Sequence, residues 1–238
     1  MHSEPVDVAL DGMRRALLAN VHGHIEWGRR LHFWKLLRLR FPDDVLFRYD
    51  VLAFRVVRFA APLWRSYAQI AESKKTLRDL LNEVPDGVLQ MYRKSLLANE
   101  RAKERLCLWR NRLRSLEWDG CTNSLVSDSI LMALMAITAR VEQPDLIPPC
   151  MTQHADLLGN LDLSGNMVAS SVDELNGEHD PYYFDYEFWI SYAASLGPDH
   201  THCPERRRTF WGFWLDECSH ISSVSNDDLR EQLAVDRP

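Results

Sequence analysis

Apolar residues recur at helical intervals along most of this 238-residue chain. The clearest example runs from Ala102 to Leu116, where apolar residues follow one another at steps of 4, 3, 4 and 3 while arginines and lysines occupy other positions. Such spacing places the apolar side chains on one face of a helix. Alternation with a period of two, which is typical of strands, is nearly absent. The chain is therefore predicted to fold as an all-α protein.

Prolines and cap residues divide this pattern into about seven predicted helices. Pro42 ends the first helix, and Pro62 is expected to kink or split the second. Pro181 and Pro204 stand where a helix begins, a position that tolerates proline because the missing N–H has no helical partner there. The predicted helices cover residues 5–40, 44–67, 75–83, 86–116, 124–141, 181–196 and 204–220.

Length and composition fit a single domain. The chain is 46% hydrophobic and 26% charged, which is the balance of a globular protein that buries a core. We therefore expect one multi-helix bundle over residues 1–221, with one longer irregular loop near residues 142–178. Residues 222–238 are polar and are expected to form a frayed tail, with at most one helical turn around Leu229.

Cysteine usage and the apolar segments indicate a cytoplasmic protein. The first residues carry no basic cluster followed by an apolar run, so no secretory signal is predicted. The longest uncharged apolar stretch, residues 129–139, is shorter than the roughly 20 residues that cross a bilayer, so no membrane association is expected. Five cysteines without CxxC spacing favour reduced thiols over a disulfide framework.

Charge is distributed unevenly along the chain. Residues 1–118 hold 22 Lys and Arg against 14 Asp and Glu, whereas residues 119–238 hold 6 against 20. Either the two halves face each other within one fold and partly neutralise each other, or one half meets a charged partner. The sequence is compatible with both interpretations.

Histidines and cysteines near the C-terminus raise the question of a metal site. If residues 204–220 form one helix, Cys203 and Cys218 lie roughly 22 Å apart, because a helix rises about 1.5 Å per residue, and they cannot share one ion. His200, His202 and Cys203 could still form part of a site, which keeps a metal-dependent enzyme open as an alternative. Motifs for nucleophilic catalysis and phosphate binding are absent, so neither an enzyme activity nor a cofactor is predicted.

Clusters of charge are interpreted as solvated faces. Asp216 and Glu217 are adjacent, and adjacent residues diverge by about 100° round a helix, which does not suit a general acid–base pair. The basic run from Arg93 to Arg114 is interrupted by glutamates in a chain that is acidic overall. Interleaved acids weaken a phosphate-binding face. We therefore expect no nucleic-acid partner.

Aromatic residues crowd the two C-terminal helices on more than one face. Either both helices lie deep in the core, or one face of them is left for a partner protein, since Tyr and Trp favour interfaces. These aromatic residues are Tyr182, Tyr183, Phe184, Tyr186, Phe188, Trp189 and Tyr192 in the first helix, and Phe210, Trp211, Phe213 and Trp214 in the second.

The same region resembles a known family. Residues 180–197 (DPYYFDYEFWISYAASLG) and 205–217 (ERRRTFWGFWLDE) are similar to the C-terminal signature of the Imm5-type immunity proteins of bacterial polymorphic toxin systems. Upstream, residues 61–64 (APLW) resemble that family's helix with a Leu-Pro step. The resemblance extends over residues 51–220 and leaves the N-terminal helical segment, residues 1–50, outside it.

The resemblance implies an all-helical bacterial protein that binds and neutralises a cognate toxin by non-covalent protein–protein interaction. An acidic face with aromatic anchors would suit an electropositive toxin cleft. A helical scaffold or adaptor protein without a toxin partner remains the alternative, because it would share the same sequence features. On the first interpretation the expected partner-binding residues are Glu178, Asp180, Tyr183, Asp185, Glu187 and Trp189.

Overall fold

The computed structural model describes residues 5–70, 186–195 and 202–235, together with residues 90, 93, 94, 96, 100, 101, 104 and 151. No strand occurs among these residues, and the predicted all-α fold is confirmed for this part of the chain. The helices of the described part are α1 (Pro5–Ala19), α2 (Trp27–Arg40), α3 (Val45–Ile70), α8 (Tyr186–Ser195), α9 (Pro204–Ser223) and α10 (Asn226–Val235).

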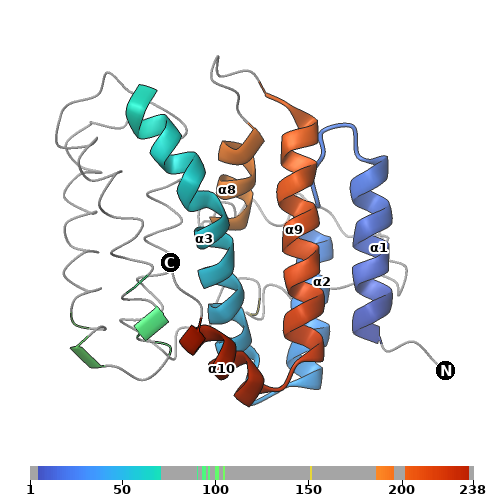
Figure 1. Cartoon of the computed structure of the whole chain (residues 1–238). Coiled ribbons are helices and arrows are strands. Elements are labelled where there is room, and N and C mark those ends of the chain that lie inside the picture. The colour runs from blue at the N-terminus through green and yellow to red at the C-terminus, as the bar shows by residue number, and fades with distance from the viewer. Residues whose placement is uncertain are drawn as a thin grey trace, which may run out of the picture.

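Helix α9 occupies the centre of this bundle. In Figure 1 it lies between α1 and α3, which run roughly alongside it. Helix α8 packs on both α9 and α3, while α2 packs on α1 and α10 packs on α3. Helices from the beginning of the chain therefore lie directly against helices from its end.

The central position of α9 explains its aromatic sequence. Phe210, Trp211 and Trp214 are fully buried, and Phe213 is half-buried. A helix with apolar residues round its axis is stable in water only where other elements cover it, and α1, α3 and α8 do so here. The interpretation that places the aromatic residues in the core is confirmed for Phe210, Trp211 and Trp214.

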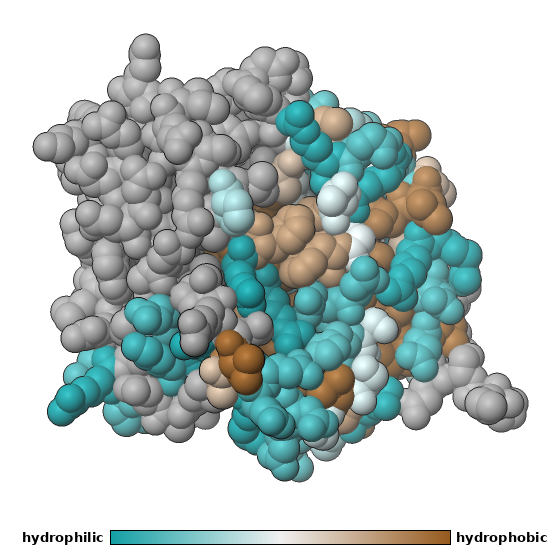
Figure 2. Space-filling model, in the orientation of Figure 1, coloured by the Kyte–Doolittle hydropathy of each residue, from teal (hydrophilic) through white to brown (hydrophobic). Residues whose placement is uncertain are grey.

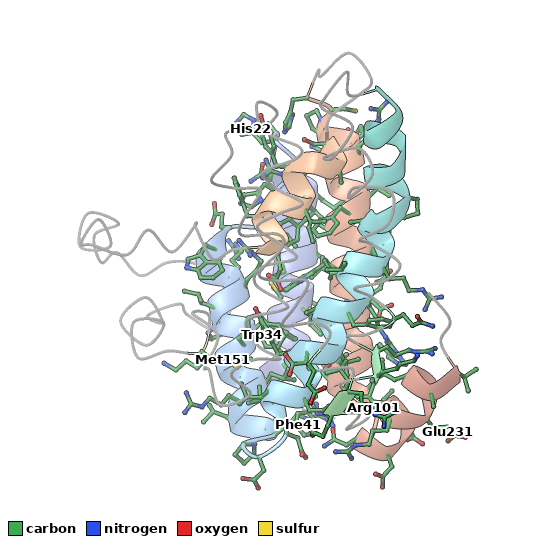
Figure 3. All side chains as sticks on the ribbon, turned by 90° about the vertical axis from the view of Figure 1, so that its left-hand side faces the viewer. His22, Trp34, Phe41, Arg101, Met151 and Glu231 are labelled. Carbon is green, nitrogen blue, oxygen red and sulfur yellow. The ribbon has the colours of Figure 1, made fainter. Side chains whose placement is uncertain are left out.

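Edge-to-face and tilted ring contacts fix α2 and α3 against α9. The ring centroid of Trp214 lies 5.6 Å from that of Trp211 and 5.8 Å from that of Phe33. Phe33 contacts Trp34 at 5.2 Å, and Trp34 contacts Tyr49 of α3 at 5.0 Å. Pairs of this kind contribute about 0.5–1.5 kcal/mol each beyond the area they bury. Figure 3 shows Trp34 within the bundle, between His22 at one end and Phe41 at the other.

Arg48 of α3 closes the C-terminal end of α9. Its side chain is buried and donates hydrogen bonds to the carbonyl oxygens of Ile221 and, at 2.9 Å, of Val224. The last carbonyls of a helix lack intrahelical donors and carry partial negative charge. A guanidinium group satisfies both requirements, so Arg48 caps α9 and ties it to α3.

Ion pairs join the basic half of the chain to the acidic half. Arg14 of α1 pairs with Asp216 at 2.9 Å, and Arg55 of α3 pairs with Glu217 at 2.6 Å. A third, buried pair joins α2 to α8 and is described below. The structure thus favours the interpretation in which the two halves face each other within one fold.

The prediction of one continuous helix over residues 5–40 is wrong. The chain turns between α1 and α2, where the Asn20 side chain accepts a hydrogen bond from the backbone N–H of His22 at 2.8 Å. Gly23 has a φ of 62°, which glycine adopts readily, and a Cβ there would overlap the Pro204 carbonyl oxygen at the start of α9. Val21, an apolar residue in this turn, is 73% exposed.

Helix α3 runs from Val45 to Ile70 without interruption at Pro62, so the proline does not split it. Helix α9 begins at Pro204 as predicted and extends to Ser223, beyond the predicted end at residue 220. Of the helix predicted over residues 86–116, the described residues 90, 93, 94, 96, 100, 101 and 104 are helical. The other helices predicted between residues 71 and 185, the loop near residues 142–178 apart from Met151, and the count of about seven helices lie outside the described residues.

The prediction of a frayed tail from residue 222 is also wrong, because residues 226–235 form α10. The Ser225 hydroxyl accepts the backbone N–H of Asp228 at 3.2 Å and donates to the Asp228 carboxylate at 2.6 Å. This exchange satisfies a backbone donor at the helix start. Leu229 and Leu233 are fully buried and anchor the helix to the core.

None of the described helices combines the length and the apolar composition that crossing a membrane requires.

Replacing Leu229 with alanine should lower the free energy of unfolding by about 2–5 kcal/mol, because a fully buried leucine leaves a cavity when it is truncated. Urea denaturation followed by circular dichroism measures the change. Val235→Ala, at a position on the same helix that is 76% exposed, should change stability by less than about 0.5 kcal/mol. Equal, small effects of both substitutions would show that α10 does not belong to the core.

Candidate functional site

An open groove of about 760 Å³ lies between α3, α9 and α10. Figure 2 shows apolar atoms at the surface between α3 and α9, with hydrophilic atoms beside them. Helix α3, from the first third of the chain, and the consecutive helices α9 and α10, from its end, contribute side chains to the groove. The lining residues are Arg55, Arg58, Phe59 and Pro62 of α3, Phe213, Asp216, Glu217 and His220 of α9, and Gln232 of α10.

A stacked aromatic pair forms the apolar part of the groove. The ring centroids of Phe59 and Phe213 lie 4.4 Å apart, with an angle of 19° between the ring planes. Phe59 also meets the buried Phe210 edge-on at 6.0 Å, which fixes the pair to the core. Both stacked rings are only partly buried, so an apolar surface remains open to solvent.

A polar network holds one wall of the groove. Arg55 donates to the Glu217 carboxylate at 2.6 Å and to the side-chain oxygen of Gln232 at 2.8 Å. A ring nitrogen of His220 lies 2.7 Å from the same Gln232 oxygen. The network joins α3, α9 and α10 through side chains that are largely shielded from water, which fixes their positions before any partner binds.

The adjacent carboxylates of α9 serve different neighbours. Glu217 turns toward α3, whereas Asp216 reaches Arg14 on α1, so their predicted divergence is confirmed. The interpretation of both as solvated charge is wrong for Glu217, whose side chain is 22% exposed and paired. The Asp216 side chain is 77% exposed, and an exposed pair of this kind contributes only about 0.2–1 kcal/mol.

A second hollow of about 540 Å³ adjoins the groove through Gln232, which lines both. Helix α10 supplies most of its lining. We refer to the surface formed by the two hollows as the groove face. The residues of the second hollow are Val224, Asp228, Glu231, Gln232 and Val235.

A buried ion pair lies on the other side of the bundle. Arg30 of α2 donates to the Glu187 carboxylate of α8 at 3.0 Å, and their side chains are 0% and 4% exposed. The Arg30 guanidinium carbon also lies 4.8 Å from the ring centroid of Trp27 and 4.9 Å from that of Trp211. Aromatic faces attract a desolvated cation, so these rings help Arg30 to remain charged inside the bundle.

A second buried arginine lies between α9 and α8. Arg207 donates from Nε to the Ser191 hydroxyl at 3.2 Å and lies 5.1 Å from the ring centroid of Phe188. The Ser191 hydroxyl in turn donates to the Phe188 carbonyl at 2.7 Å. Polar contacts therefore orient α8 relative to the first turns of α9.

His24 lies between these two arginines and is held neutral. Its ring meets Phe188 and Trp211 edge-on, with centroids 5.5 and 5.4 Å apart. Burial lowers its pKa from 6.5 to about 3, and the positive charges of Arg207 and Arg30 act in the same direction. Burial also raises the pKa of the Cys218 thiol, so this cysteine stays protonated. Cys218 is a core residue, and His24 is partly buried beside the core.

Of the six expected partner-binding residues, only Glu187 has its side chain described. Its interpretation as a surface contact is wrong, because it is 3% exposed and pairs with Arg30. Trp189 lies in α8, but its side chain is outside the described residues, as are Glu178, Asp180, Tyr183 and Asp185.

The alternative of a metal site draws no support from the described residues. Cys203 is partly buried and Cys218 fully buried, and both are free thiols. His202 is exposed at the start of the chain segment that leads into α9. No group of three potential ligands capable of holding a metal ion occurs in the part of the chain that the structure describes. His200 lies outside it.

Sequence reasoning missed the groove face. Periodicity identified α3 and α9 separately, but no local signal shows that Phe59 stacks on Phe213. Helix α10 did have a detectable signal, since Ser225 followed three residues later by Asp228 is a capping pattern. Recognising that pattern would have placed Asp228 and Glu231 on a helix.

Comparison of the chain with protein-family models, with curated proteins and with solved structures finds no match.

Breaking the buried ion pair should be costly. Arg30→Met and Glu187→Met should each lower the free energy of unfolding by about 3–5 kcal/mol, because each leaves one buried charge without its counterion. In the double variant the free energy of unfolding should fall by less than the sum of the two single effects. Urea denaturation in a double-mutant cycle measures this difference. Arg14→Met, at the exposed pair, should cost at most about 1 kcal/mol. Additive effects at Arg30 and Glu187 would contradict the coupling.

His24 should make the fold sensitive to acid. Its pKa is about 3 in the folded chain, against the ordinary value of 6.5 for histidine. The unfolded chain therefore binds more protons below about pH 6.5, and stability falls as the pH falls. His24→Phe, which retains a ring, should lose less stability than the wild type between about pH 7 and pH 4. The slopes of the free energy of unfolding against pH should differ by up to about 1.4 kcal/mol per pH unit.

Urea denaturation at several pH values measures this difference. His22→Gln is the matched control, since that side chain is exposed. It should retain most of the wild-type dependence, because His22 is the smallest of the causes that lower the pKa of His24. Identical pH profiles for wild type and His24→Phe would show that His24 is not protonated preferentially on unfolding.

Proposed function

We propose that this chain is an immunity protein that binds a cognate bacterial toxin in the cytoplasm and neutralises it by non-covalent interaction. The resemblance of residues 180–197 and 205–217 to the signature of that family supports the class. Within those stretches, Phe210, Trp211 and Trp214 are core residues, which is the role expected of a signature that specifies a helical bundle.

The observation that carries the proposal is the open groove with its partly exposed aromatic pair. Interfaces concentrate binding energy in aromatic and arginine residues at preorganised positions, and the groove combines Phe59 and Phe213 with the network around Arg55. Neutralisation by occlusion needs only a rigid complementary surface. Helices fixed by buried aromatic contacts and ion pairs supply such a surface at little conformational cost on binding.

The proposal also includes a single helical bundle. The contacts of α1, α2 and α3 with α8, α9 and α10 support this view, because residues near both ends of the chain share one core.

Co-expression with the product of the neighbouring toxin-like gene tests the function. The chain should restore growth of bacteria that express this product and should co-purify with it, because occlusion requires a stable complex. The matched control is a toxin of an unrelated class, against which the chain should give no protection. If the chain neither restores growth nor co-purifies with the toxin, the proposal is contradicted and the scaffold or adaptor protein is favoured.

A further inference from the structure

The groove face carries more negative than positive charge. Among the described residues that line it, four carry a carboxylate, namely Asp216, Glu217, Asp228 and Glu231, and two carry a guanidinium group, Arg55 and Arg58. Both arginines are partly buried, and Arg55 is directed to Glu217. Asp228 and Glu231 are exposed, as is Asp216, which pairs with Arg14, so the lining charges most open to solvent are carboxylates. Their summed field attracts a basic partner and steers its approach.

Apolar surface lies between these carboxylates. The Phe59–Phe213 pair is partly exposed in the groove, and Val224 and Val235 line the adjoining hollow, where Val235 is 76% exposed. Figure 3 shows Glu231 at the outer edge of α10. A ligand for this surface must therefore present an apolar group together with positive charge.

We infer that the groove face is where the toxin binds, and that it accepts a basic segment of the toxin whose aromatic or long aliphatic side chain covers the Phe59–Phe213 pair. This inference rests on the proposed function and specifies its surface. Glu187, one of the contacts expected from the sequence, is buried in an ion pair with Arg30 and cannot contact a partner. We therefore assign the acidic surface to α9 and α10.

Other occupants fit this surface less well. Phosphate groups of a nucleic acid would be repelled by the exposed carboxylates. A second copy of this chain, docked symmetrically, would bring Asp216 and Glu231 toward the same acidic face of its partner, and like charges across an interface are unfavourable.

A peptide probe tests the surface without the toxin. The probe is a short peptide with one tryptophan flanked by lysines, and its matched control carries glutamates in place of the lysines. Titration into the isotopically labelled full chain should shift backbone amide resonances of α9 and α10 near Phe213 and Gln232. The glutamate peptide should bind about tenfold more weakly or not at all.

A charge-reversed variant completes this experiment. Asp216→Lys with Glu231→Lys should weaken lysine-peptide binding about tenfold, and both positions are exposed, so folding should be retained. Asp7→Lys with Asp11→Lys, at exposed positions of α1, makes the same change in net charge and should bind like the wild type. Shifts confined to other helices, equal affinity for both peptides, or unchanged binding by the charge-reversed variant would each overturn the inference.

The growth assay separates this inference from the proposed function. The charge-reversed variant should lose rescue while the α1 variant keeps it. Rescue by the wild type and equally by the charge-reversed variant would leave the function standing and overturn the groove face as the toxin surface. Absence of rescue by the wild type itself would overturn the function, and with it the toxin as the occupant.

Discussion

Helix α9 carries fully buried aromatic residues, and in water it can exist as a helix only while α1, α3 and α8 cover it. The other described elements are arranged to meet that requirement. Gly23 lets the turn after α1 approach the start of α9 closely, and Arg48 closes its opposite end. Because the covering helices come from both ends of the sequence, the chain must close over a long separation before this core forms.

Packing of the two ends of the chain against each other also explains the uneven distribution of charge along the sequence. Basic side chains of α1, α2 and α3 meet acidic side chains of α8 and α9, most completely where Arg30 and Glu187 are both buried. A buried pair costs desolvation and adds little net stability, but a mismatched packing would leave a bare charge inside the protein. We therefore regard the Arg30–Glu187 pair as an interaction that specifies how α8 packs. Asp228 and Glu231 of α10 are exposed to solvent.

Local sequence rules predicted what depends on local interactions. Helical periodicity gave the all-α class and the positions of α3 and α9, and Pro204 marked the start of α9. The break after Ala19 was missed because its reason is the close approach of Gly23 to α9, which lies far away in sequence. Glu187 was misplaced for the same reason, since its burial depends on Arg30 in another helix. The groove face likewise depends on tertiary packing. Only the start of α10 could have been predicted, from the capping pattern at Ser225.

The central claim is that the core-forming helix α9 and its neighbour α10 also present the partner-binding surface. Hydrogen–deuterium exchange of the chain, alone and in complex with the toxin whose growth inhibition it relieves, tests this claim most directly. We predict slower exchange on complex formation in residues 213–235, with little change in α1. Protection confined to α1, or to segments away from α9 and α10, would contradict the account.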